Sequence, residues 1–292
     1  MRRMIERYET TAAATGARIV HCCGFDSIPS DLGVYFLQQQ ALERFGSHCE
    51  RVKMRVRAMR GGASGGTVAS MMNIARELAG DPALRREMAN PYFLCPPDHP
   101  AKARQPNVVF AERDEDFDAW VAPFVMGGVN TRVVHRSNAL AGCAYGNSFR
   151  YDEAVLTGRG IGGYATAMGI ASAVGAFMLG AGIAPTRWVL EKFVPAPGEG
   201  PSPDAQEKGF FDLRFVGKTA DGEELRVKVT GDRDPGYGST AKMLSQAGLC
   251  LARDIAKEKT PGGFWTPATI FGDRLIERLR RDAGLTFEVL DD

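Results

Sequence analysis

The sequence has 292 residues, which is the length of one large domain or of two domains of ordinary size. Hydrophobic residues make up 44% of the chain and charged residues 24%, a composition that is typical of globular proteins and excludes a disordered one. Lys and Arg total 36 against 35 for Asp and Glu, and the formal net charge of +1 gives no electrostatic basis for binding nucleic acid.

The first residues predict one helix–strand–loop–helix unit of an open parallel sheet. Residues 1–8 have helical spacing, and Gly16 is a suitable end for that helix. Residues 17–23 are a short apolar, β-branched run that is typical of a buried strand, residues 24–31 are a loop, and residues 32–45 are helical. The single strand needs a partner, either from later in the chain or from residues that the chain lacks.

Strict alternation in residues 51–60 predicts a half-exposed strand, with Val52, Met54, Val56 and Ala58 on one face and basic residues on the other. Further helices are expected at 67–79, 82–90, 237–256 and 273–283, further strands at 108–110, 119–125, 131–135, 210–216 and 223–229, and a Pro-rich loop at 195–203. The last two of these strands alternate on either side of a glycine-containing turn, which predicts a hairpin.

No charged residue occurs between Arg159 and Arg187, and this stretch is long enough to span a bilayer. It is rich in Gly and Ala, so a helix packed tightly inside the protein is the favoured interpretation. A lipid-facing helix at a membrane surface and a transmembrane helix are the alternatives. Trp188 and Lys192 would suit the interfacial end of either one.

Six Cys and four His are irregularly spaced along the chain. Because there is no CxxC pair and no CxxC…HxxxH pattern, we expect no metal site. A chain of this length does not need disulfides to hold its core together. We therefore expect reduced thiols and a cytoplasmic protein.

Residues 24–31 (GFDSIPSD) are the first candidate site, because open α/β sheets bind ligands where a parallel strand ends and a helix begins. Ser30 or Asp31 could cap the following helix, and shaping this turn and cap is the alternative role. The loop is longer than a cap requires, and Gly24 and Pro29 restrict its backbone. Both features favour a ligand site.

Residues 61–67 (GGASGGT) are the second candidate, since consecutive glycines before a helix let backbone N–H groups converge on an anion. The segment lacks the Lys-Ser/Thr ending of a P-loop and the GxGxxG spacing of a dinucleotide fingerprint. A turn that lets backbones pack closely is the alternative. Residues 231–240 form a similar turn-rich entry to a helix, which Ser239 or Thr240 could cap.

Residues 130–151 are the third candidate, because polar donors stand beside apolar residues there. Arg132, His135 and Arg136 could hold a carboxylate or polarise a carbonyl, and Tyr145 could donate a proton. A sheet face with solvated Arg side chains is the alternative.

Motifs spread over nearly the whole chain resemble the saccharopine dehydrogenase-like oxidoreductase family, and within it the trans-acting enoyl reductase branch. They are HCCGFDSIPSDLGV (21–34), GGASGGTVAS (61–70), NTRVVHRSNAL (130–140), YGNSFRY (145–151), PAPGEGPS (195–202), TGDRDPGYGSTAKML (230–244) and GGFWTPATIFGDRLIERL (262–279).

This resemblance implies an α/β protein with a partial, doubly wound Rossmann domain, followed by an α+β substrate domain with a mixed sheet and C-terminal helices. The implied units are residues 1–46 for the remnant of the NAD(P)-binding domain, 47–230 for the substrate domain with its Gly/Ala-rich stretch at 160–186, and 231–292 for the closing helical segment. The family pattern begins with a strand and a glycine-rich pyrophosphate turn, and nothing like it precedes Met1. We therefore expect that this chain lacks the first part of the Rossmann domain and that it could be inactive alone.

The resemblance further implies an NAD(P)-dependent oxidoreductase, with NADPH favoured over NADH and no metal. In related enzymes the loop that corresponds to residues 24–29 lies near the cofactor and substrate. The implied cofactor-binding residues are therefore Gly24, Phe25, Asp26, Ser27 and Pro29.

The implied reaction is reduction of an enoyl thioester on a lipid- or polyketide-linked intermediate of glycolipid biosynthesis, with Arg136, Asn138 and Tyr145 as candidate catalytic residues. A catalytically inactive, lipid- or membrane-associated member of the family and a saccharopine dehydrogenase-type amino-acid enzyme are the alternatives. The expected partners are a lipid-linked small molecule, a membrane surface and a second copy of the chain, but no nucleic acid. The expected location is cytoplasmic, including the periphery of the plasma membrane.

Overall fold

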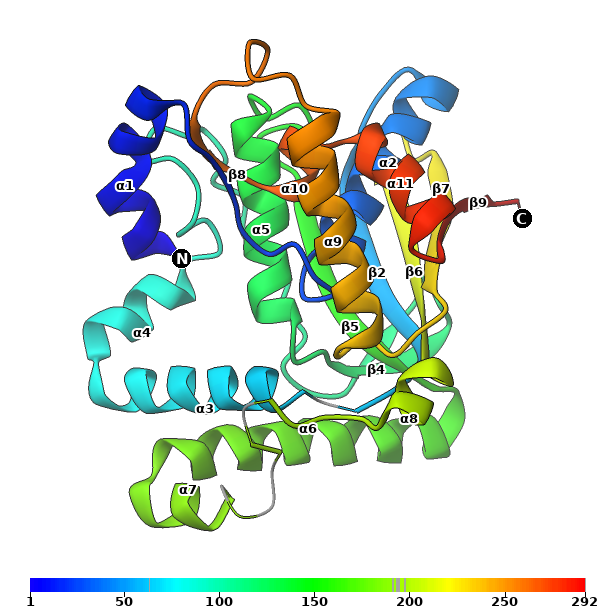
Figure 1. Cartoon of the computed structure of the whole chain (residues 1–292). Coiled ribbons are helices and arrows are strands. Elements are labelled where there is room, and N and C mark those ends of the chain that lie inside the picture. The colour runs from blue at the N-terminus through cyan, green and yellow to red at the C-terminus, as the bar shows by residue number, and fades with distance from the viewer. Residues whose placement is uncertain (63, 191, 193–194, 197, 292) are drawn as a thin grey trace.

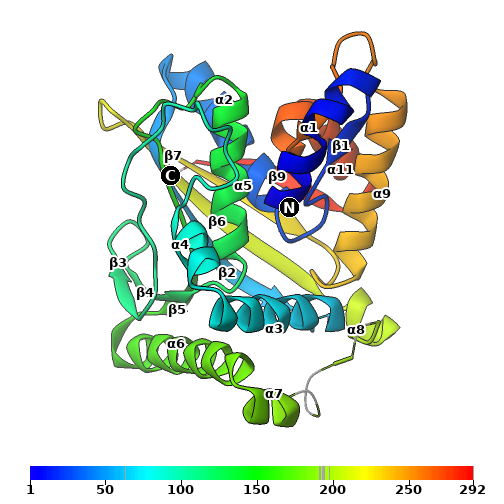
Figure 2. The same ribbon diagram turned by 90° about the vertical axis from the view of Figure 1, so that its left-hand side faces the viewer.

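The computed structural model describes residues 1–62, 64–190, 192, 195–196 and 198–291 (Figures 1 and 2). Its helices are α1 (Arg2–Thr15), α2 (Ile28–Phe45), α3 (Gly65–Gly80), α4 (Pro82–Ala89), α5 (Gly127–Leu140), α6 (Gly160–Gly182), α7 (Ala184–Leu190), α8 (Pro203–Glu207), α9 (Gly238–Arg253), α10 (Pro267–Ile270) and α11 (Asp273–Asp282). Its strands are β1 (Arg18–Val20), β2 (Cys49–Arg60), β3 (Glu112–Asp114), β4 (Ala119–Pro123), β5 (Arg150–Gly158), β6 (Phe210–Thr219), β7 (Glu224–Gly231), β8 (Gly263–Trp265) and β9 (Leu285–Leu290).

The main sheet has seven strands in the order β3-β4-β5-β2-β6-β7-β9. The β2–β5 pair is parallel, and the other pairs are antiparallel. Helices α2 and α5 pack against the sheet and against each other, whereas α6 lies along β4 and α3 at one end of the molecule (Figure 1). The α/β class with a mixed sheet and C-terminal helices is therefore confirmed.

Strand β1 is the parallel strand that the sequence predicts near the N-terminus, although it is only three residues long. Strand β1 pairs in parallel with β8, from Arg18↔Gly263 to Val20↔Trp265. Its partner therefore comes from later in the chain, which was one of the two expectations. Helix α1 precedes β1 and ends at Gly16, whose φ of 72° is the left-handed conformation that glycine adopts readily.

Helix α2 begins at Ile28, four residues earlier than predicted, because Pro29 fits the first turn of a helix. Leu32 and Leu37 are fully buried against the main sheet. Gly33 is needed there, since a Cβ atom at this position would lie 2.4 Å from the ring of Phe215.

Helix α5 replaces the strand predicted at 131–135, and that prediction is wrong. The buried residues of α5 include Asn130, Val133, Val134 and Ser137, which recur at helical spacing. Two adjacent β-branched residues favour a strand locally, but packing of this face against α2 and β5 outweighs that preference.

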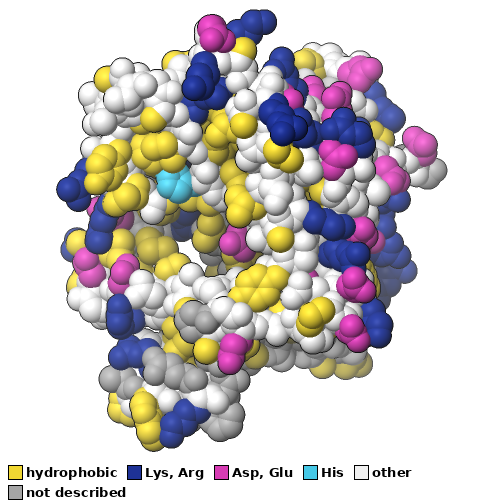
Figure 3. All heavy atoms as spheres, in the orientation of Figure 1, with side chains coloured by type: hydrophobic (Ala, Val, Ile, Leu, Met, Phe, Trp, Pro, Cys, Tyr) yellow, Lys and Arg dark blue, Asp and Glu magenta, His cyan; other side chains and the backbone are white. Residues whose placement is uncertain are grey.

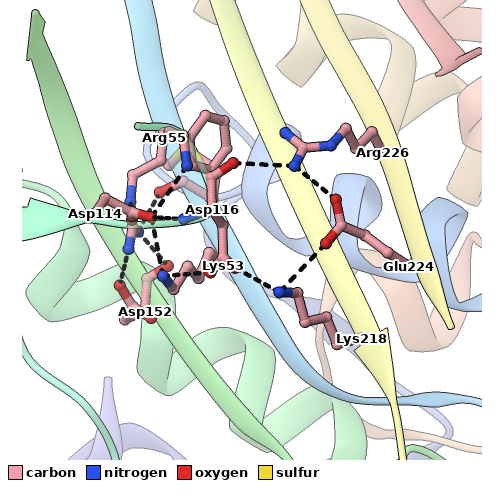
Figure 4. Close-up of polar contacts among 10 residues, drawn as sticks. Lys53, Arg55, Asp114, Asp116, Asp152, Lys218, Glu224 and Arg226 are labelled. Atoms are coloured by element: carbon pink, nitrogen blue, oxygen red, sulfur yellow. Dashed lines mark hydrogen bonds and ion pairs between the residues drawn. The ribbon is translucent and has the colours of Figure 1, made fainter. Parts of the chain in front are cut away.

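Lys53 and Arg55 on the basic face of β2 are buried, whereas Arg51 and Arg57 on the same face are exposed, so the prediction of a half-exposed strand is wrong only for the middle of β2. Lys53 and Arg55 enter an ion-pair network with three aspartates from β3, the turn after it and β5 (Figure 4). Arg55 lies 2.7 Å from a carboxylate oxygen of Asp114 and 2.6 Å from one of Asp152. The network continues on β6 and β7 through Lys218, Glu224 and Arg226.

Helix α6 occupies the uncharged stretch, and only Gly163, Ala167, Ala171 and Ala181 of its described residues are buried. The interpretation as a helix packed inside the protein is therefore wrong. Figures 1 and 2 show α6 and α7 as the outermost layer of the molecule, beyond α3. By length and composition α6 could also cross a membrane.

Most other predicted elements are confirmed. Helices α3, α4, α9 and α11 lie where the sequence places them, and β6 and β7 form the predicted hairpin. No strand forms at 108–110, where the chain is irregular, and β3 begins only at Glu112. Pro197 of the Pro-rich loop lies outside the described residues. The domain boundaries after residues 46 and 230 remain predictions.

Candidate functional site

A cavity of about 670 Å³ opens between α3, α4 and α5, beside the loop that follows β1. Figure 3 shows this region as a hollow rimmed by hydrophobic side chains. The three candidate segments of the sequence and the related turn at 231–240 meet there. The segments contribute Asp26, Ser64, Gly66, Thr67 and Arg132, and the turn contributes Gly236, Tyr237 and Thr240. Cys22, just before the first segment, also lines the cavity.

The loop after β1 is held against the start of α9. The backbone N–H of Phe25 donates to Oγ1 of Thr240 at 3.0 Å. Gly24 allows this approach, because a Cβ atom there would lie 2.9 Å from Cγ2 of Thr240. Cys22 has a φ of 61°, an uncommon conformation for a non-glycine residue, and it turns the loop toward the cavity. Burial raises the pKa of Asp26, the one carboxyl among the described residues that line this cavity.

The other predicted cofactor residues lie behind the cavity wall. The Phe25 ring is buried in the main core against Phe211. Ser27 precedes α2, is fully buried and donates to Oδ1 of Asn130 at 3.1 Å. Pro29 is buried in the first turn of α2.

The glycines of the second candidate segment permit close backbone packing. A Cβ atom on Gly65 would lie 1.8 Å from the carbonyl oxygen of Ala196. The Gly65 N–H donates to the carbonyl of Glu199 at 2.9 Å, and Ser64 caps α3 by accepting from the Thr67 N–H at 3.1 Å. The close-packing alternative is thus confirmed, and phosphate binding stays a prediction. Ala63 of this segment lies outside the described residues.

Asp234 caps α9, and the prediction that Ser239 or Thr240 does so is wrong. Its carboxylate is fully buried and accepts from the N–H groups of Tyr237 at 3.0 Å and Gly238 at 2.7 Å. The hydroxyls of Ser239 and Thr240 donate instead to backbone carbonyls of the preceding turn.

Asp31 also has an unexpected role. It lies inside α2, not at its start, so it does not cap that helix. Its carboxylate accepts from Oγ of Ser137 at 2.5 Å and from the N–H of Ala268 at 2.8 Å, at the start of α10. Burial raises the pKa of Asp31 to about 7.

The cavity interior is mainly apolar and unusually rich in methionine. Its apolar lining comes from α3, α4, α5 with the two residues before it, and α6. It includes Met71, Ile74, Leu78, Met88, Val125, Met126, Val129 and Met178. Methionine side chains are flexible and adapt to apolar ligands of irregular shape. The cavity therefore suits a hydrocarbon chain.

Arg132 supplies positive charge at this apolar cavity. Its guanidinium donates to the backbone carbonyls of Gly128 and Met88 and lies over the ring of Phe93. Its Nε atom is buried and has no hydrogen-bond partner among the described residues. Burial lowers the pKa of Arg132. A buried N–H donor of this kind can bind a carbonyl oxygen on which negative charge develops.

Arg136, Asn138 and Tyr145 do not line this cavity. Arg136 donates to the carbonyls of Leu94 at 2.5 Å and Phe264 at 2.8 Å. The amide of Asn138 bonds to the backbone of the turn after α5, including the Tyr145 N–H at 2.9 Å. Tyr145 is buried among core aromatic rings, and burial raises its pKa far above the ordinary value.

Glu153 is a further buried acid that sequence reasoning missed. Its carboxyl oxygens accept from the Tyr151 hydroxyl at 2.7 Å and from Nδ2 of Asn130 at 2.9 Å. Burial raises the pKa of Glu153 to about 7. No local sequence pattern indicates that Glu153 is buried, because the sequence of a strand does not show which of its faces a helix will cover. Within the part of the chain that the structure describes, no group of His, Cys, Asp or Glu residues could hold a metal ion.

Comparison with known proteins identifies relatives in mycobacteria. A Mycobacterium tuberculosis H37Rv protein, provisionally named as a trans-acting enoyl reductase, is 39% identical over 96% of this chain and 69% of its own length. The trans-acting enoyl reductases of Mycobacterium ulcerans and Mycobacterium bovis BCG are 36% identical over 95% of this chain and 69% of theirs. No family model and no solved structure matches the chain significantly. The chain belongs to the trans-acting enoyl reductase family.

Proposed function

We propose that this protein is an NADPH-dependent enoyl reductase that acts on lipid- or polyketide-linked thioesters in glycolipid biosynthesis. The observation that carries the proposal is the methionine-rich cavity, in which the loop after β1 meets the segments at 64–67 and 236–240 around an apolar interior. Family membership supports the reaction, and the shape and lining of the cavity support a long hydrocarbon substrate.

The loop after β1 is the proposed contact with the nicotinamide. It follows a parallel strand, which is where open α/β sheets bind such cofactors. Asp26 and Cys22 face the cavity from this loop, so they would hold the nicotinamide end. The described residues show no comparable fit for the pyrophosphate, since Gly24 is packed against Thr240 and Gly65 against Ala196.

A reduced nicotinamide bound by this loop would supply the hydride that the β-carbon of the enoyl thioester needs. The electron pair of the double bond then moves toward the thioester oxygen, and the α-carbon takes up a proton. Arg132 would stabilise the negative charge on that oxygen through its unpartnered Nε–H. The apolar lining would hold the chain in place and exclude water from the reacting carbons. In this proposal Arg136 and Asn138 position the C-terminal end of α5 through backbone contacts.

Fluorescence titration with NADPH tests the cofactor assignment. We would compare this chain with a form extended upstream toward the length of its relatives. Saturable binding by the extended form alone would place the pyrophosphate site in the extension, whereas binding by both would place it within these 292 residues. Lack of binding by both forms, with the fold intact, would contradict the proposal and favour an inactive, lipid-associated protein.

We also propose that α6 and α7 lie on a lipid surface from which the substrate enters. Ile161 is 87% exposed, Leu179 72% and Trp188 61%. A helix that is apolar on all sides is typical of a protein interior or a membrane, and α6 is largely uncovered. The Nζ atom of Lys192 lies over the Trp188 ring, 3.4 Å from its centroid, and such a cation–π pair suits the headgroup region. Met178 of α6 lines the cavity, so the lipid-facing layer adjoins the substrate site.

Flotation with vesicles of anionic phospholipid tests this surface. The wild type is expected to float, and Leu179→Asp is expected to remain in the soluble fraction. Leu244→Asp is a matched control, because Leu244 is 57% exposed on α9 and should not affect flotation. If Leu179→Asp instead dissociates a dimer that does not bind vesicles, α6 is a contact between two copies and the lipid proposal is wrong.

A further inference from the structure

A second cavity, of about 270 Å³, adjoins the apolar one, and Ala89, Gly128 and Arg132 line both. It lies where residues 105–108 run past the end of β5 that β4 does not reach. Unlike its neighbour, this cavity is lined mainly by polar side chains.

Two deeply buried side chains in this polar cavity have unsatisfied atoms. His135 and Asp152 are 2% and 3% exposed, and both line the cavity. His135 Nε2 and Asp152 Oδ1 have no hydrogen-bond partner within the described part of the chain, and neither does Nε of Arg132. Three residues that line this one small cavity therefore each carry an unpaired, buried polar atom.

Such atoms are costly unless something binds them. A buried polar group without a partner destabilises the folded state, and native proteins contain few of them. The other contacts of these side chains are specific, since Oδ2 of Asp152 lies 2.6 Å from Arg55 and the His135 ring packs against Tyr92 at 5.0 Å. Both side chains are thus held in position, while His135 Nε2 and Asp152 Oδ1 stay without a partner.

The charge of the cavity favours a neutral ligand with both donors and acceptors. Burial lowers the pKa of His135 to about 3, so its ring is uncharged near neutral pH. Arg55 neutralises Asp152, and burial raises the pKa of Glu153 to about 7. The free Asp152 oxygen needs a donor, whereas the Arg132 Nε–H needs an acceptor. Amide and hydroxyl groups supply both.

We propose that this polar cavity binds the amide-bearing pantetheine arm of an acyl thioester whose acyl chain occupies the apolar cavity. The inference rests on the proposed function, because a thioester carbonyl at Arg132 has the acyl chain on one side and the carrier arm on the other. The N–H groups of the arm can donate to the free oxygen of Asp152, and its amide groups can pair with the free nitrogen of His135, while Arg132 binds the thioester oxygen. The shared walls place the two parts of one molecule in adjacent cavities.

Calorimetric titration with saturated thioesters and no cofactor tests this subsite. Decanoyl-pantetheine is expected to bind about tenfold more tightly than the S-ethyl thioester of decanoic acid, because it gains hydrogen bonds to otherwise unpaired groups. His135→Phe keeps the aromatic packing and removes the ring nitrogens. It should abolish the preference and leave binding of the ethyl thioester unchanged.

Thr131→Val is a second variant that guards against misfolding of the first. Thr131 lines the polar cavity, and its hydroxyl donates to the carbonyl four residues earlier in α5, that of Gly127. Thr166→Val is the matched control, because the Thr166 hydroxyl makes the same bond to Gly162 in α6, outside both cavities. Only the Thr131 variant should weaken the preference for decanoyl-pantetheine.

The outcomes separate this inference from the proposed function. Equal binding of the two thioesters by the wild type would overturn the subsite and leave the acyl cavity standing. A preference that persists in both cavity variants would overturn its assignment to this cavity. Failure of the folded protein to bind either thioester would overturn the proposed function together with the inference.

Discussion

Arg132 links the apolar and polar cavities, and its guanidinium is held by two backbone carbonyls with Nε left unpaired. Replacing it by Met should lower enoyl thioester turnover about 100-fold or more, the usual effect of losing a donor to a developing oxyanion. Steady-state kinetics measure this effect. Arg86→Met is the matched control, because Arg86 is exposed on α4 and lines neither cavity. Equal loss in both variants would contradict the role of Arg132.

Glu153 should make stability depend on pH. Because burial raises its pKa to about 7, the folded protein binds a proton that the unfolded chain releases near its ordinary, lower pKa. The free energy of unfolding should therefore fall as the pH rises from about 5 to 7, by about 1 kcal/mol per pH unit from this group.

Glu153→Gln removes that contribution. Urea unfolding across this pH range should show the variant gaining stability relative to the wild type as the pH rises. Taking the difference between the two proteins cancels the opposite effect of His135, whose pKa is lowered. A constant difference would show that Glu153 has no raised pKa.

For single residues, the sequence predicted which segments lie at the cavity better than it predicted which side chains face it. It placed Asp26 in a ligand loop and singled out Arg132, and both line the apolar cavity. Arg136, Asn138 and Tyr145 carry suitable functional groups, but backbone contacts and core packing engage them. Spacing alone cannot show whether a polar side chain will meet a ligand or the carbonyl of a distant loop.

Among the elements, the start of α3 depends on a close backbone approach. Gly65→Ala would place a Cβ atom 1.8 Å from the carbonyl oxygen of Ala196, so the two segments must move apart. We expect a loss of about 1–3 kcal/mol in the free energy of unfolding, measured with denaturant. Gly66→Ala is the control, since the nearest atom to its Cβ is Ser64 Oγ at 3.9 Å. A stable Gly65 variant would contradict the close approach.

Strand β2 depends on its buried ion pairs. Arg55→Met leaves Asp114 and Asp152 without their main cation and should cost about 3–5 kcal/mol in thermal or denaturant unfolding. Arg57→Met, two residues away, should cost less than about 1 kcal/mol, because that side chain is 60% exposed and pairs with Asp212 at 3.4 Å. Similar losses in both variants would show that burial of the network is not what matters.

Element type was predictable where one periodicity dominated, as in α9, α11 and the β6–β7 hairpin. The prediction of element type failed in α5, because adjacent β-branched residues there lie on a helix whose buried face is set by α2 and β5. The prediction also failed for Lys53 and Arg55 on β2, because the aspartates that neutralise these two buried side chains come from 59 or more residues away in the sequence. Long-range partners of this kind leave no local signal.

For the whole molecule, the mixed sheet and C-terminal helices agree with the class predicted from sequence, and the relatives support an enoyl reductase. The exposure of α6 was only an alternative at the level of sequence, since a run of Gly and Ala fits a protein interior as well as a surface. The molecule therefore combines an exposed apolar layer, an apolar cavity beside it and a polar cavity that shares Arg132, an order that suits the proposed reduction of a lipid-linked thioester.

The most direct measurement of that account is deuterium transfer from NADPH labelled at the transferable position of its nicotinamide. A dec-2-enoyl thioester would be incubated with the form of the protein that binds NADPH, and the product would be analysed by mass spectrometry. The account predicts a saturated thioester with deuterium on its β-carbon and loss of this product in Arg132→Met. An unchanged enoyl thioester, in a sample where the thioester and NADPH are both bound, would contradict it.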